Sequence, residues 1–411
     1  MPITVDPSVA TSKRQHLLDR ERSCEDPWAS LPGELRGRLR DCDSHLILNP
    51  EETYRILGSE LGEPMLRKRS MQYAALDGVA PFTKDGKSVW KAKGTMAHGA
   101  RDVLERLDIL DEMGVHQQVL FGSGMASVFW GPADLAYPAA RRFNEFAAQW
   151  ASPASVRLRP AAIVNCQDPK RALQEAEYAL RLGLKAVQLA FYPDFRPGPD
   201  HESWDGLWAL LSNAGVPALL HWDMRWSLIE RAGEASKVHV RTGIAVGERQ
   251  DGVSSRALES LLPASASTNE AFAVMTAHHT PEQFLSTLAL SGVFERHPRL
   301  RIGVFECTSF WIGPWLERLD ALQAALRGAR EGSELLSSVV KRALRVTPLY
   351  GEPFIQQMRL HELQDVFVFA SDFPHPEGGI QPLQELSQQS GGEVELLEKV
   401  LVLNADAVFP A

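Results

Sequence analysis

The sequence predicts an α/β protein built as a (β/α)8 TIM barrel with an N-terminal arm and loop insertions. After residue 38, short hydrophobic runs alternate with helical patterns along the chain. This alternation is typical of strand–helix units that form a parallel sheet. Seven or eight such units occur within 411 residues, and that number favours a closed barrel over an open sheet.

The predicted strands are short hydrophobic runs, and the helices between them carry end signals. The strands cover 39–47, 116–122, 158–164, 184–190, 216–221, 301–306 and 366–372, with one more near 345–350. In "DVLERLDILDEMG", Asp102 is the predicted N-cap, Glu105 follows three residues later and Gly114 ends the helix. In "DPKRALQEAEYALRLG", Asp168 is the predicted cap and Pro169 the first helical residue.

The regions outside this pattern divide into an arm and two insertions. Residues 1–38 are polar and contain several prolines, so we expect an N-terminal arm, followed by the barrel over 39–411. Residues 50–100 and 223–270 are poorly periodic. We expect them to be insertions in the loops after the first and fifth strands, where a barrel builds its active site.

Composition excludes several classes of function. The formal charge of −9 leaves no basic surplus to neutralise phosphates, so nucleic acid is not an expected partner. No hydrophobic run approaches the roughly 20 residues that span a bilayer, and the first residues lack the hydrophobic core of a secretion signal. The cysteines form no CxxC pair, which argues against a disulfide framework or a thiolate zinc site. A cytoplasmic location is the expectation. The cysteines are Cys24, Cys42, Cys166 and Cys307.

Four predicted strands end in residues that can bind a metal. The first carries Asp43 and His45, whose i, i+2 spacing points both side chains to one side of an extended chain. His221, Glu306 and Asp372 end three later strands. In a barrel these ends meet at the C-terminal face. Two imidazoles with carboxylates suit one divalent ion, zinc first, with manganese or iron as alternatives.

The motifs "DCDSHLILNP", "GVFERHPRLRIGVFE" and "FASDFPHPEG" resemble the amidohydrolase superfamily, in the branch of aminocarboxymuconate-semialdehyde decarboxylase. The resemblance covers most of residues 39–405. It implies a metal-dependent barrel enzyme in which Asp43, His45, His221 and Asp372 bind one divalent ion. Relatives are often dimers, so a homodimer is an expectation.

The sequence departs from that branch at two positions. Asp43 stands where the branch has histidine or glutamate, and the aspartate makes the site more anionic than the H-x-H version. Glu306 stands where the decarboxylases have a histidine that acts as acid or base. Glu306 could inherit that role if burial raises its pKa, or it could join the metal ligands. His278 is another candidate acid or base, with a surface or helix-end histidine as its alternative.

Three further residues are candidates for substrate contact. Arg225 and Trp226 follow His221 and could bind a carboxylate and an aromatic ring. His375 lies three residues beyond Asp372 and could hydrogen-bond a ligand or the substrate, or serve only the turn.

Three functions remain open from the sequence, all with a small molecule as partner. The first is decarboxylation of a small aromatic or dienoic acid, with Asp372 or Glu306 as the proton donor. The second is hydrolysis of a C–N, C–O or C–C bond by metal-activated water. The third is a barrel without catalysis that serves as a binding protein.

Overall fold

The computed structural model describes most of the barrel and few of the N-terminal residues. It covers residues 28, 31–48, 50–69, 94, 97–123, 132–190, 197–222, 274–327, 334–349, 351–375 and 378–409. Most of the predicted arm, the greater part of the predicted insertion at 50–100 and the predicted insertion at 223–270 therefore lie outside the described residues.

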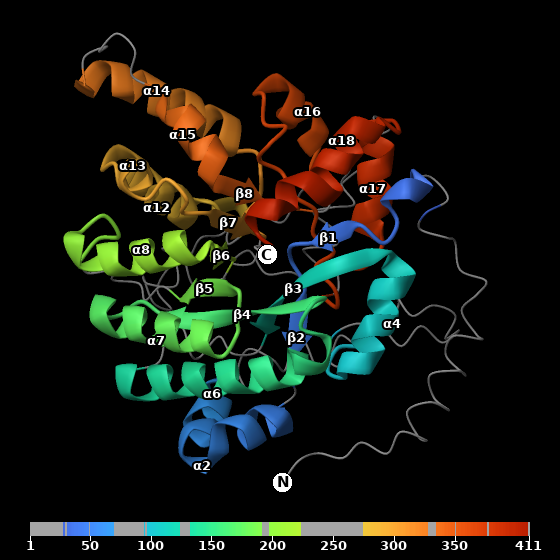
Figure 1. The fold of residues 1–411 in the computed structure, drawn as a ribbon, viewed down its shortest axis with the longest axis vertical. Helices are drawn as coiled ribbons and strands as arrows, with labels where there is room; N and C mark the ends of the chain where they lie inside the picture. The colour runs from blue at the N-terminus through green and yellow to red at the C-terminus, as the bar shows by residue number, and fades with distance from the viewer. Residues whose placement is uncertain are drawn as a thin grey trace, which may run out of the picture.

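A parallel sheet of eight short strands forms the centre of the molecule (Figure 1). The strands are β1 (Leu39–Asp41), β2 (His45–Ile47), β3 (Val115–Ser123), β4 (Leu158–Asn165), β5 (Ala186–Ala190), β6 (Ala218–His221), β7 (Ile302–Phe305) and β8 (Leu344–Val346). Their order is β1-β3-β4-β5-β6-β7-β8, and β2 also pairs with β3. The predicted strand 39–47 is thus split into β1 and β2, which both lie beside β3.

Residues 366–373 close this sheet into the predicted barrel. On one side, the Val346 amide donates to the Val366 carbonyl at 3.0 Å. On the other side, the Cys42 amide donates to the Phe369 carbonyl at 2.9 Å. The segment therefore occupies the eighth position of the barrel, between β8 and the β1–β2 strand pair, although only isolated bridges tie it to them.

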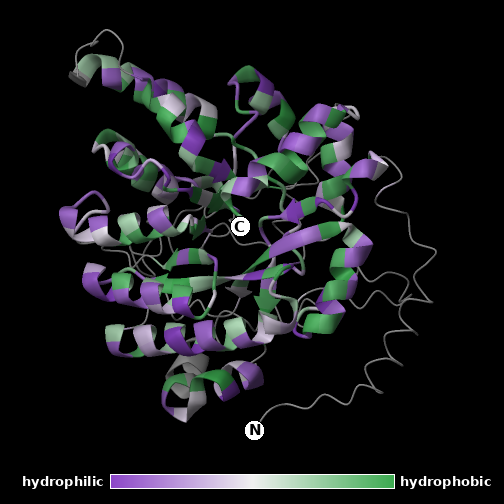
Figure 2. Cartoon of the chain, viewed as in Figure 1, coloured by the Kyte–Doolittle hydropathy of each residue, from purple (hydrophilic) through white to green (hydrophobic). Residues whose placement is uncertain are grey.

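Helices surround the strands, with α2 on the outer side of α6 (Figure 1). Figure 2 shows hydrophobic and hydrophilic residues alternating along them, as expected for helices with one buried side. No helix in the described residues is long and hydrophobic enough to cross a bilayer. The helices are α2 (Pro50–Arg69), α4 (Val103–Met113), α6 (Ala133–Ala151), α7 (Pro169–Arg181), α8 (Asp205–Ala214), α12 (His279–Leu290), α13 (Val293–Arg296), α14 (Ile312–Arg327), α15 (Leu336–Ala343), α16 (Phe354–Leu360), α17 (Gln381–Ser390) and α18 (Val394–Glu398).

The predicted helix ends are confirmed. The Asp102 carboxylate accepts from the amides of Leu104 and Glu105, at 2.8 and 3.0 Å. Gly114 ends α4 in the left-handed conformation, with φ of 69°. The Glu105 side chain does not complete a capping box, because its carboxylate accepts from the Gly99 amide instead. Asp168 caps α7 in the same way as Asp102 caps α4.

The described part of the predicted arm packs against the barrel. Trp28 and Leu35 are buried in the main core. The Trp28 indole donates to the Met113 carbonyl at 3.1 Å. Its ring lies directly against Gly114, where any side chain would collide with it. The end of the arm therefore adds hydrophobic contact to the barrel, while the division between arm and barrel at residue 38 stays a prediction.

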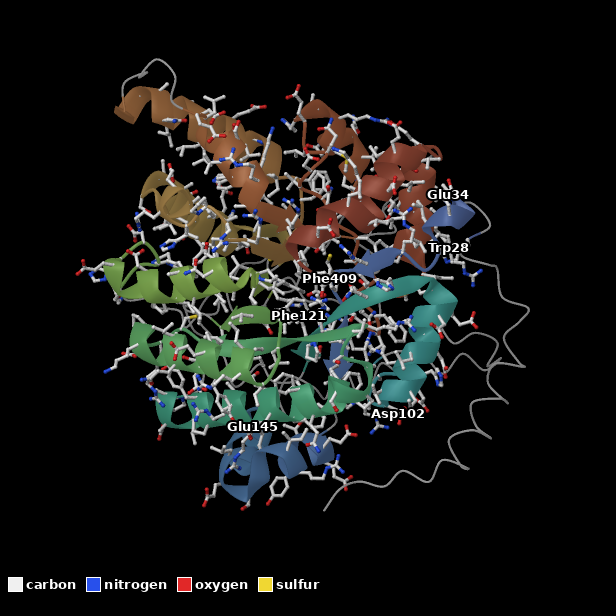
Figure 3. All side chains as sticks on the ribbon, viewed as in Figure 1. Trp28, Glu34, Asp102, Phe121, Glu145 and Phe409 are labelled. Carbon is white, nitrogen blue, oxygen red and sulfur yellow. The ribbon has the colours of Figure 1, made fainter. Side chains whose placement is uncertain are left out.

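The interior of the barrel is filled by side chains. Phe121, Leu219 and Phe305 from the strands pack with Phe409 near the C-terminus of the chain. Figure 3 shows Phe121 and Phe409 near the middle of the ring of helices. Phe409 also lies beneath Arg40 of β1, whose guanidinium carbon is 5.9 Å from the ring centre. The C-terminal segment therefore closes the end of the barrel at which the strands begin.

A buried carboxylate ties the closing segment to the first strand. Asp41 is fully buried and accepts from the Ser371 amide at 2.8 Å and from the Ser371 hydroxyl at 2.5 Å. Gln118 of β3 donates to the same carboxylate at 2.7 Å. Arg106 of α4, also fully buried, donates to Gln118 and to the His45 carbonyl. This network links three neighbouring parts of the barrel wall.

We expect Ser371→Ala to lower the free energy of unfolding by about 1–3 kcal/mol, because it removes a hydrogen bond to a buried carboxylate. Chemical denaturation measured by circular dichroism checks this. Ser152→Ala is the control, because the Ser152 hydroxyl donates only to an exposed helix-end carbonyl. Equal stability of the two variants would contradict the role given to the Asp41 network.

Candidate metal centre

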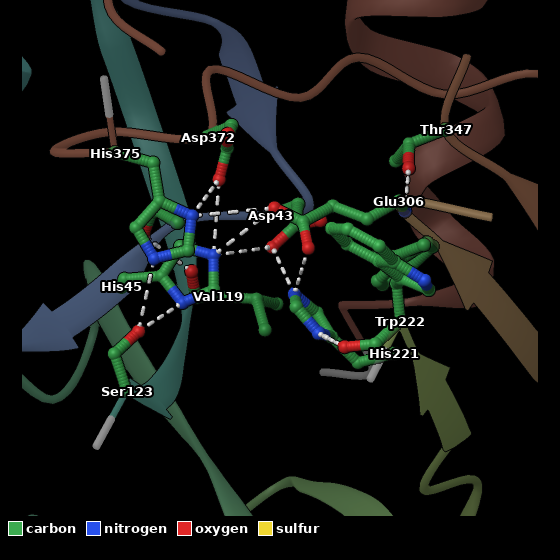
Figure 4. Close-up of polar contacts among 12 residues, drawn as sticks. Asp43, His45, Val119, Ser123, His221, Trp222, Glu306, Thr347, Asp372 and His375 are labelled. Carbon is green, nitrogen blue, oxygen red and sulfur yellow. Dashed lines mark hydrogen bonds and ion pairs between the residues drawn. The ribbon is translucent and has the colours of Figure 1, made fainter. Parts of the chain in front are cut away.

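Six side chains of the types that can bind a metal meet at the C-terminal face of the barrel (Figure 4). Their convergence follows from the fold, because parallel strands end on the same side. They are Asp43 and His45 from the β1–β2 region, His221 at the end of β6, Glu306 after β7, and Asp372 and His375 from the closing segment.

His45 lies in the middle of the cluster. Its Nε2 atom is 3.0 Å from Asp372 Oδ1 and 3.6 Å from both Asp43 Oδ1 and Glu306 Oε1. The backbone holds these residues together, since the Asp372 amide donates to the Asp43 carbonyl at 2.9 Å. The D-x-H pair therefore points both side chains at one place, as its spacing predicts.

His221 lies on the side of the cluster opposite His375, and Glu306 lies between the two histidines (Figure 4). His221 Nε2 is 3.4 Å from Asp43 Oδ1 and 3.4 Å from Glu306 Oε2. Its Nδ1 atom lies 3.0 Å from the Trp222 carbonyl, which fixes the ring with Nε2 facing the carboxylates. Glu306 is held by a hydrogen bond from its amide to the Thr347 hydroxyl.

His375 brings a third imidazole to the cluster. Its Nδ1 atom is 3.0 Å from Asp372 Oδ1 and 3.3 Å from Glu306 Oε1. Its ring stacks on that of His45, with centres 3.6 Å apart. The turn that carries it requires Gly378, because a side chain there would collide with the Asp372 backbone.

Two of the carboxylates sit on unusual backbone. Glu306 has φ of 56° and Asp372 has φ of 50°, in the left-handed region that residues other than glycine rarely adopt. Such strain, of the order of 1–3 kcal/mol per residue, is found mainly at functional sites. Here it turns each carboxylate from the end of its strand toward His45.

Several donor atoms of the cluster are buried without a hydrogen-bond partner among the described residues. They include both carboxylate oxygens of Asp43, Nε2 of His45 and of His221, and Oδ1 of Asp372. Buried polar atoms are almost always satisfied in proteins. These atoms lack a hydrogen bond but lie within ion-pair distance of one another around one small space. Such an arrangement suits a divalent cation, so the donor set fits a metal ion.

Burial and mutual charge shift the protonation of the cluster. Burial lowers the pKa of His45 to about 4. Burial, followed by the charge of Glu306, raises the pKa of Asp372 well above its ordinary value. Burial opposes a charge on His221, but the carboxylates of Glu306 and Asp43 outweigh it and raise the pKa to about 9. Without a metal, protons on some of these groups therefore balance the carboxylate charge.

A sequence model of the amidohydrolase family matches residues 41–411. The chain belongs to the amidohydrolase family. This agrees with the resemblance found in the sequence. Comparison with curated proteins gives no match.

Solved structures share the amidohydrolase barrel at low identity. An amidohydrolase from Mycobacterium avium subsp. paratuberculosis K-10 is 18% identical with a TM-score of 0.62, over 90% of this chain and 99% of that one. The 5-carboxyvanillate decarboxylase of Novosphingobium aromaticivorans DSM 12444, with bound manganese and 3-methoxy-4-hydroxy-5-nitrobenzoic acid, is 18% identical with a TM-score of 0.61, over 93% and 99%. A dihydroxybenzoic acid decarboxylase from Polaromonas sp. JS666, with manganese and 2-nitroresorcinol, is 17% identical with a TM-score of 0.57, over 90% and 96%. At such identity the likeness establishes the fold alone.

Three other residues are predicted for this amidohydrolase site, and the structure describes one of them, His278. His278 precedes α12, where its ring stacks on Trp311. No contact joins it to the six-residue cluster in the described part of the chain, so the geometry gives no support to its predicted catalytic role. Arg225 and Trp226 lie outside the described residues, and their contact with substrate stays a prediction.

A cavity opens from the cluster and has mainly hydrophobic walls. Asp43, Glu306 and Asp372 line one part of it. Other lining residues are Trp222, Val274, Ala277, Pro348, Leu349 and Phe369. The cavity therefore places hydrophobic surface beside the candidate metal ligands, as a flat organic substrate would require.

Ser123 is a residue of the site that the sequence reading missed. It ends β3, and its hydroxyl oxygen lies 2.7 Å from His45 Nδ1 and 3.2 Å from His375 Nε2. The available signal was its position, one residue beyond a predicted strand in a barrel. Ser123 therefore orients both imidazoles from behind, on the side away from the carboxylates.

We expect Ser123→Ala to weaken divalent metal binding by roughly 10–100-fold, because loss of a partner behind a ligating histidine has that effect. Competition with a fluorescent chelator measures the affinity. Ser152→Ala should bind as the wild type does. Unchanged affinity in Ser123→Ala would show that the hydroxyl does not orient the ligands.

The metal-free protein should lose stability as pH rises. The folded pKa of His221, about 9, lies above the ordinary 6.5, so its contribution is complete below pH 6.5 and is lost as pH passes through 9. The shift corresponds to about 3 kcal/mol. The free energies of unfolding of wild type and His221→Asn, measured from pH 6 to 10, should therefore differ at low pH and become equal at high pH. A difference that stays constant with pH would contradict this.

Proposed function

We propose that this amidohydrolase is a metal-dependent decarboxylase of a small aromatic or dienoic carboxylic acid. The observation that carries the proposal is the set of buried donor atoms on Asp43, His45, His221 and Asp372 that have no hydrogen bond within the described residues. Two of these residues, Asp43 and Asp372, also line a mainly hydrophobic cavity. Neighbours with the same fold include decarboxylases of aromatic acids. That likeness supports the choice of reaction and substrate class.

The four residues predicted as metal ligands would hold a divalent ion, which would polarise substrate oxygens as a Lewis acid. Zinc stays a prediction. Carboxylate ligands suit a harder ion, and the two decarboxylase neighbours named above hold manganese. Manganese is therefore the second metal to be tested.

Asp372 and His375 are the residues we propose for handling the proton. Decarboxylation breaks the bond to the carboxyl carbon, and the electron pair left on the substrate carbon takes up a proton. His375 Nδ1 lies 3.0 Å from Asp372 Oδ1, and Asp372 lines the cavity. Burial raises the pKa of Asp372. Burial also opposes a charge on His375, but the carboxylate of Asp372 outweighs this effect and raises the pKa of His375 well above its ordinary value. In the metal-free protein the pair therefore holds a proton at neutral pH. His375 is not one of the four predicted metal ligands, so it can keep this proton when the ion is bound and deliver it to carbon.

Glu306 favours hydrolysis as the second candidate reaction. Burial alone would raise its pKa, but the charges of His221 and His375 hold it well below the ordinary value. An ionised Glu306 can accept a proton but cannot donate one, which suits the activation of water. The non-catalytic alternative leaves the unpartnered donor atoms unexplained. A homodimer and a cytoplasmic location stay predictions.

Metal-loaded protein should release carbon dioxide from at least one member of a panel of hydroxybenzoic and dienoic acids. We expect His221→Ala to lose metal and to lose activity by more than the roughly 100-fold that an outer partner costs. His116→Ala, at the opposite end of the barrel, is the matched control because His116 is exposed near the start of β3. Isotope uptake from ¹⁸O-labelled water into product, without carbon dioxide, would indicate hydrolysis instead. Absence of bound metal in the wild type would overturn both reactions.

A further inference from the structure

We propose that Glu385 determines substrate specificity by accepting a hydrogen bond from a hydroxyl or amino group of the substrate. The inference rests on the proposed function and adds a feature of the substrate to it. Glu385 belongs to α17 and lines the same cavity as Asp43, Glu306 and Asp372. It is therefore part of the cavity wall but not of the six-residue cluster.

The wall of this cavity is mainly hydrophobic around the helices that follow β8. The lining residues on α16 and α17 are Phe354, Pro382, Glu385 and Leu386. Among the described lining residues, Glu385 is the one charged side chain outside the cluster. A charged group in such a wall costs free energy unless it is paired. Its carboxylate is therefore suited to bind a polar group of the molecule that fills the cavity.

Two hydrogen bonds hold the Glu385 carboxylate in place. The Gly351 amide donates to Oε2 at 2.6 Å, and the Gln389 side-chain amide donates to Oε1 at 3.2 Å. An ionised carboxylate has about four acceptor positions. Within the described residues each oxygen therefore accepts one hydrogen bond and keeps a position for a further donor. The carboxylate is oriented before a ligand binds.

A second carboxylate near the cavity illustrates a purely structural role. Glu352 is buried and accepts from the Ser309 amide, the Ser309 hydroxyl and the Leu349 amide, at 2.6–3.1 Å. These bonds tie the loop after β7 to the loop after β8. Glu352 is not among the described residues that line the cavity. Glu385 differs in both respects, because it accepts from fewer donors and lines the cavity.

The substrate group that Glu385 binds is distinct from the carboxylate that leaves. A substrate carboxylate is attracted to a metal ion and repelled by the negative charge of Glu385. Burial raises the pKa of Glu385, so its charged form gains from a donor that stabilises it. An aromatic acid with its carboxylate at the metal and a hydroxyl or amino group at Glu385 therefore satisfies both polar parts of the cavity wall.

Binding of matched benzoic acids to metal-loaded protein tests the inference. The probes are the meta and para hydroxybenzoates and aminobenzoates, each compared by isothermal titration calorimetry with the methylbenzoate of the same ring position. We expect at least one hydroxy or amino acid to bind roughly 10–100-fold more tightly than its methyl counterpart, which is the effect of a hydrogen bond to a charged group. The pair with the larger difference identifies the donor as a hydroxyl or an amine.

Three variants distinguish substrate binding from a structural role. Glu385→Leu should bind the preferred acid and its methyl counterpart equally, with the affinity for the methyl acid unchanged. Glu385→Gln keeps an acceptor oxygen and should show a smaller preference, so it serves as the test if Glu385→Leu does not fold. Gln388→Leu, which changes an exposed residue of the same helix, should keep the full preference. Equal loss of affinity for every acid in Glu385→Leu would indicate a structural role and overturn the inference.

The remaining outcomes separate this inference from the proposed function. Equal binding of hydroxy, amino and methyl acids by the wild type, or a preference that survives in Glu385→Leu, would overturn the role of Glu385. The decarboxylase would stand in that case if carbon dioxide is released. A preference that Glu385→Leu abolishes, without carbon dioxide release from any acid, would overturn the reaction and support the role of Glu385. No binding of any probe by metal-loaded protein would overturn the inference whatever the carbon dioxide assay gives.

Discussion

Closure of the barrel by residues 366–373 is the constraint on which the candidate metal centre depends. This segment carries Asp372 and leads into the turn that carries His375. Its hydrogen bonds to the first strand set how far Asp372 lies from Asp43 and His45. The segment is held by scattered bridges instead of a continuous ladder, so the buried Asp41 carboxylate supplies much of its attachment. The same few contacts therefore complete the fold and assemble the site.

The residues of the candidate metal centre are in conformations and surroundings that are unfavourable in a protein interior. Carboxylates and imidazoles are brought out of water, two residues adopt left-handed backbone, and several donor atoms find no partner in the described part of the chain. Each of these costs free energy of folding. A bound cation would offset much of that cost because it interacts favourably with every ligand at once, so metal binding and folding are coupled in such a site.

Most elements of the barrel, and four residues of its candidate metal centre, could be predicted from the sequence. Hydrophobic runs and cap residues such as Asp102 depend on local patterning, which is why the strands and helices could be predicted. Strand-end positions placed Asp43, His45, His221 and Asp372 together once a barrel was assumed. The contact of Ser123 with two rings could not be predicted, because it depends on side-chain rotation across separate strands. For His278 the sequence left two roles open, an acid or base and a helix-end histidine. Its packing on Trp311 depends on tertiary contacts that local patterning does not carry.

The packed interior of the barrel beneath the candidate metal centre determines the side from which substrate enters and product leaves. Phe409 and the strand side chains above it leave the interior of the barrel packed from the end at which the strands begin. In the part of the chain that the structure describes, the approach to the centre is the cavity lined by Asp43, Glu306 and Asp372. Substrate and product must therefore pass through the same opening. A molecule bound over the metal ligands blocks the exit of a product formed beneath it. In a cavity with one opening, the rate of turnover depends on the order in which the products leave.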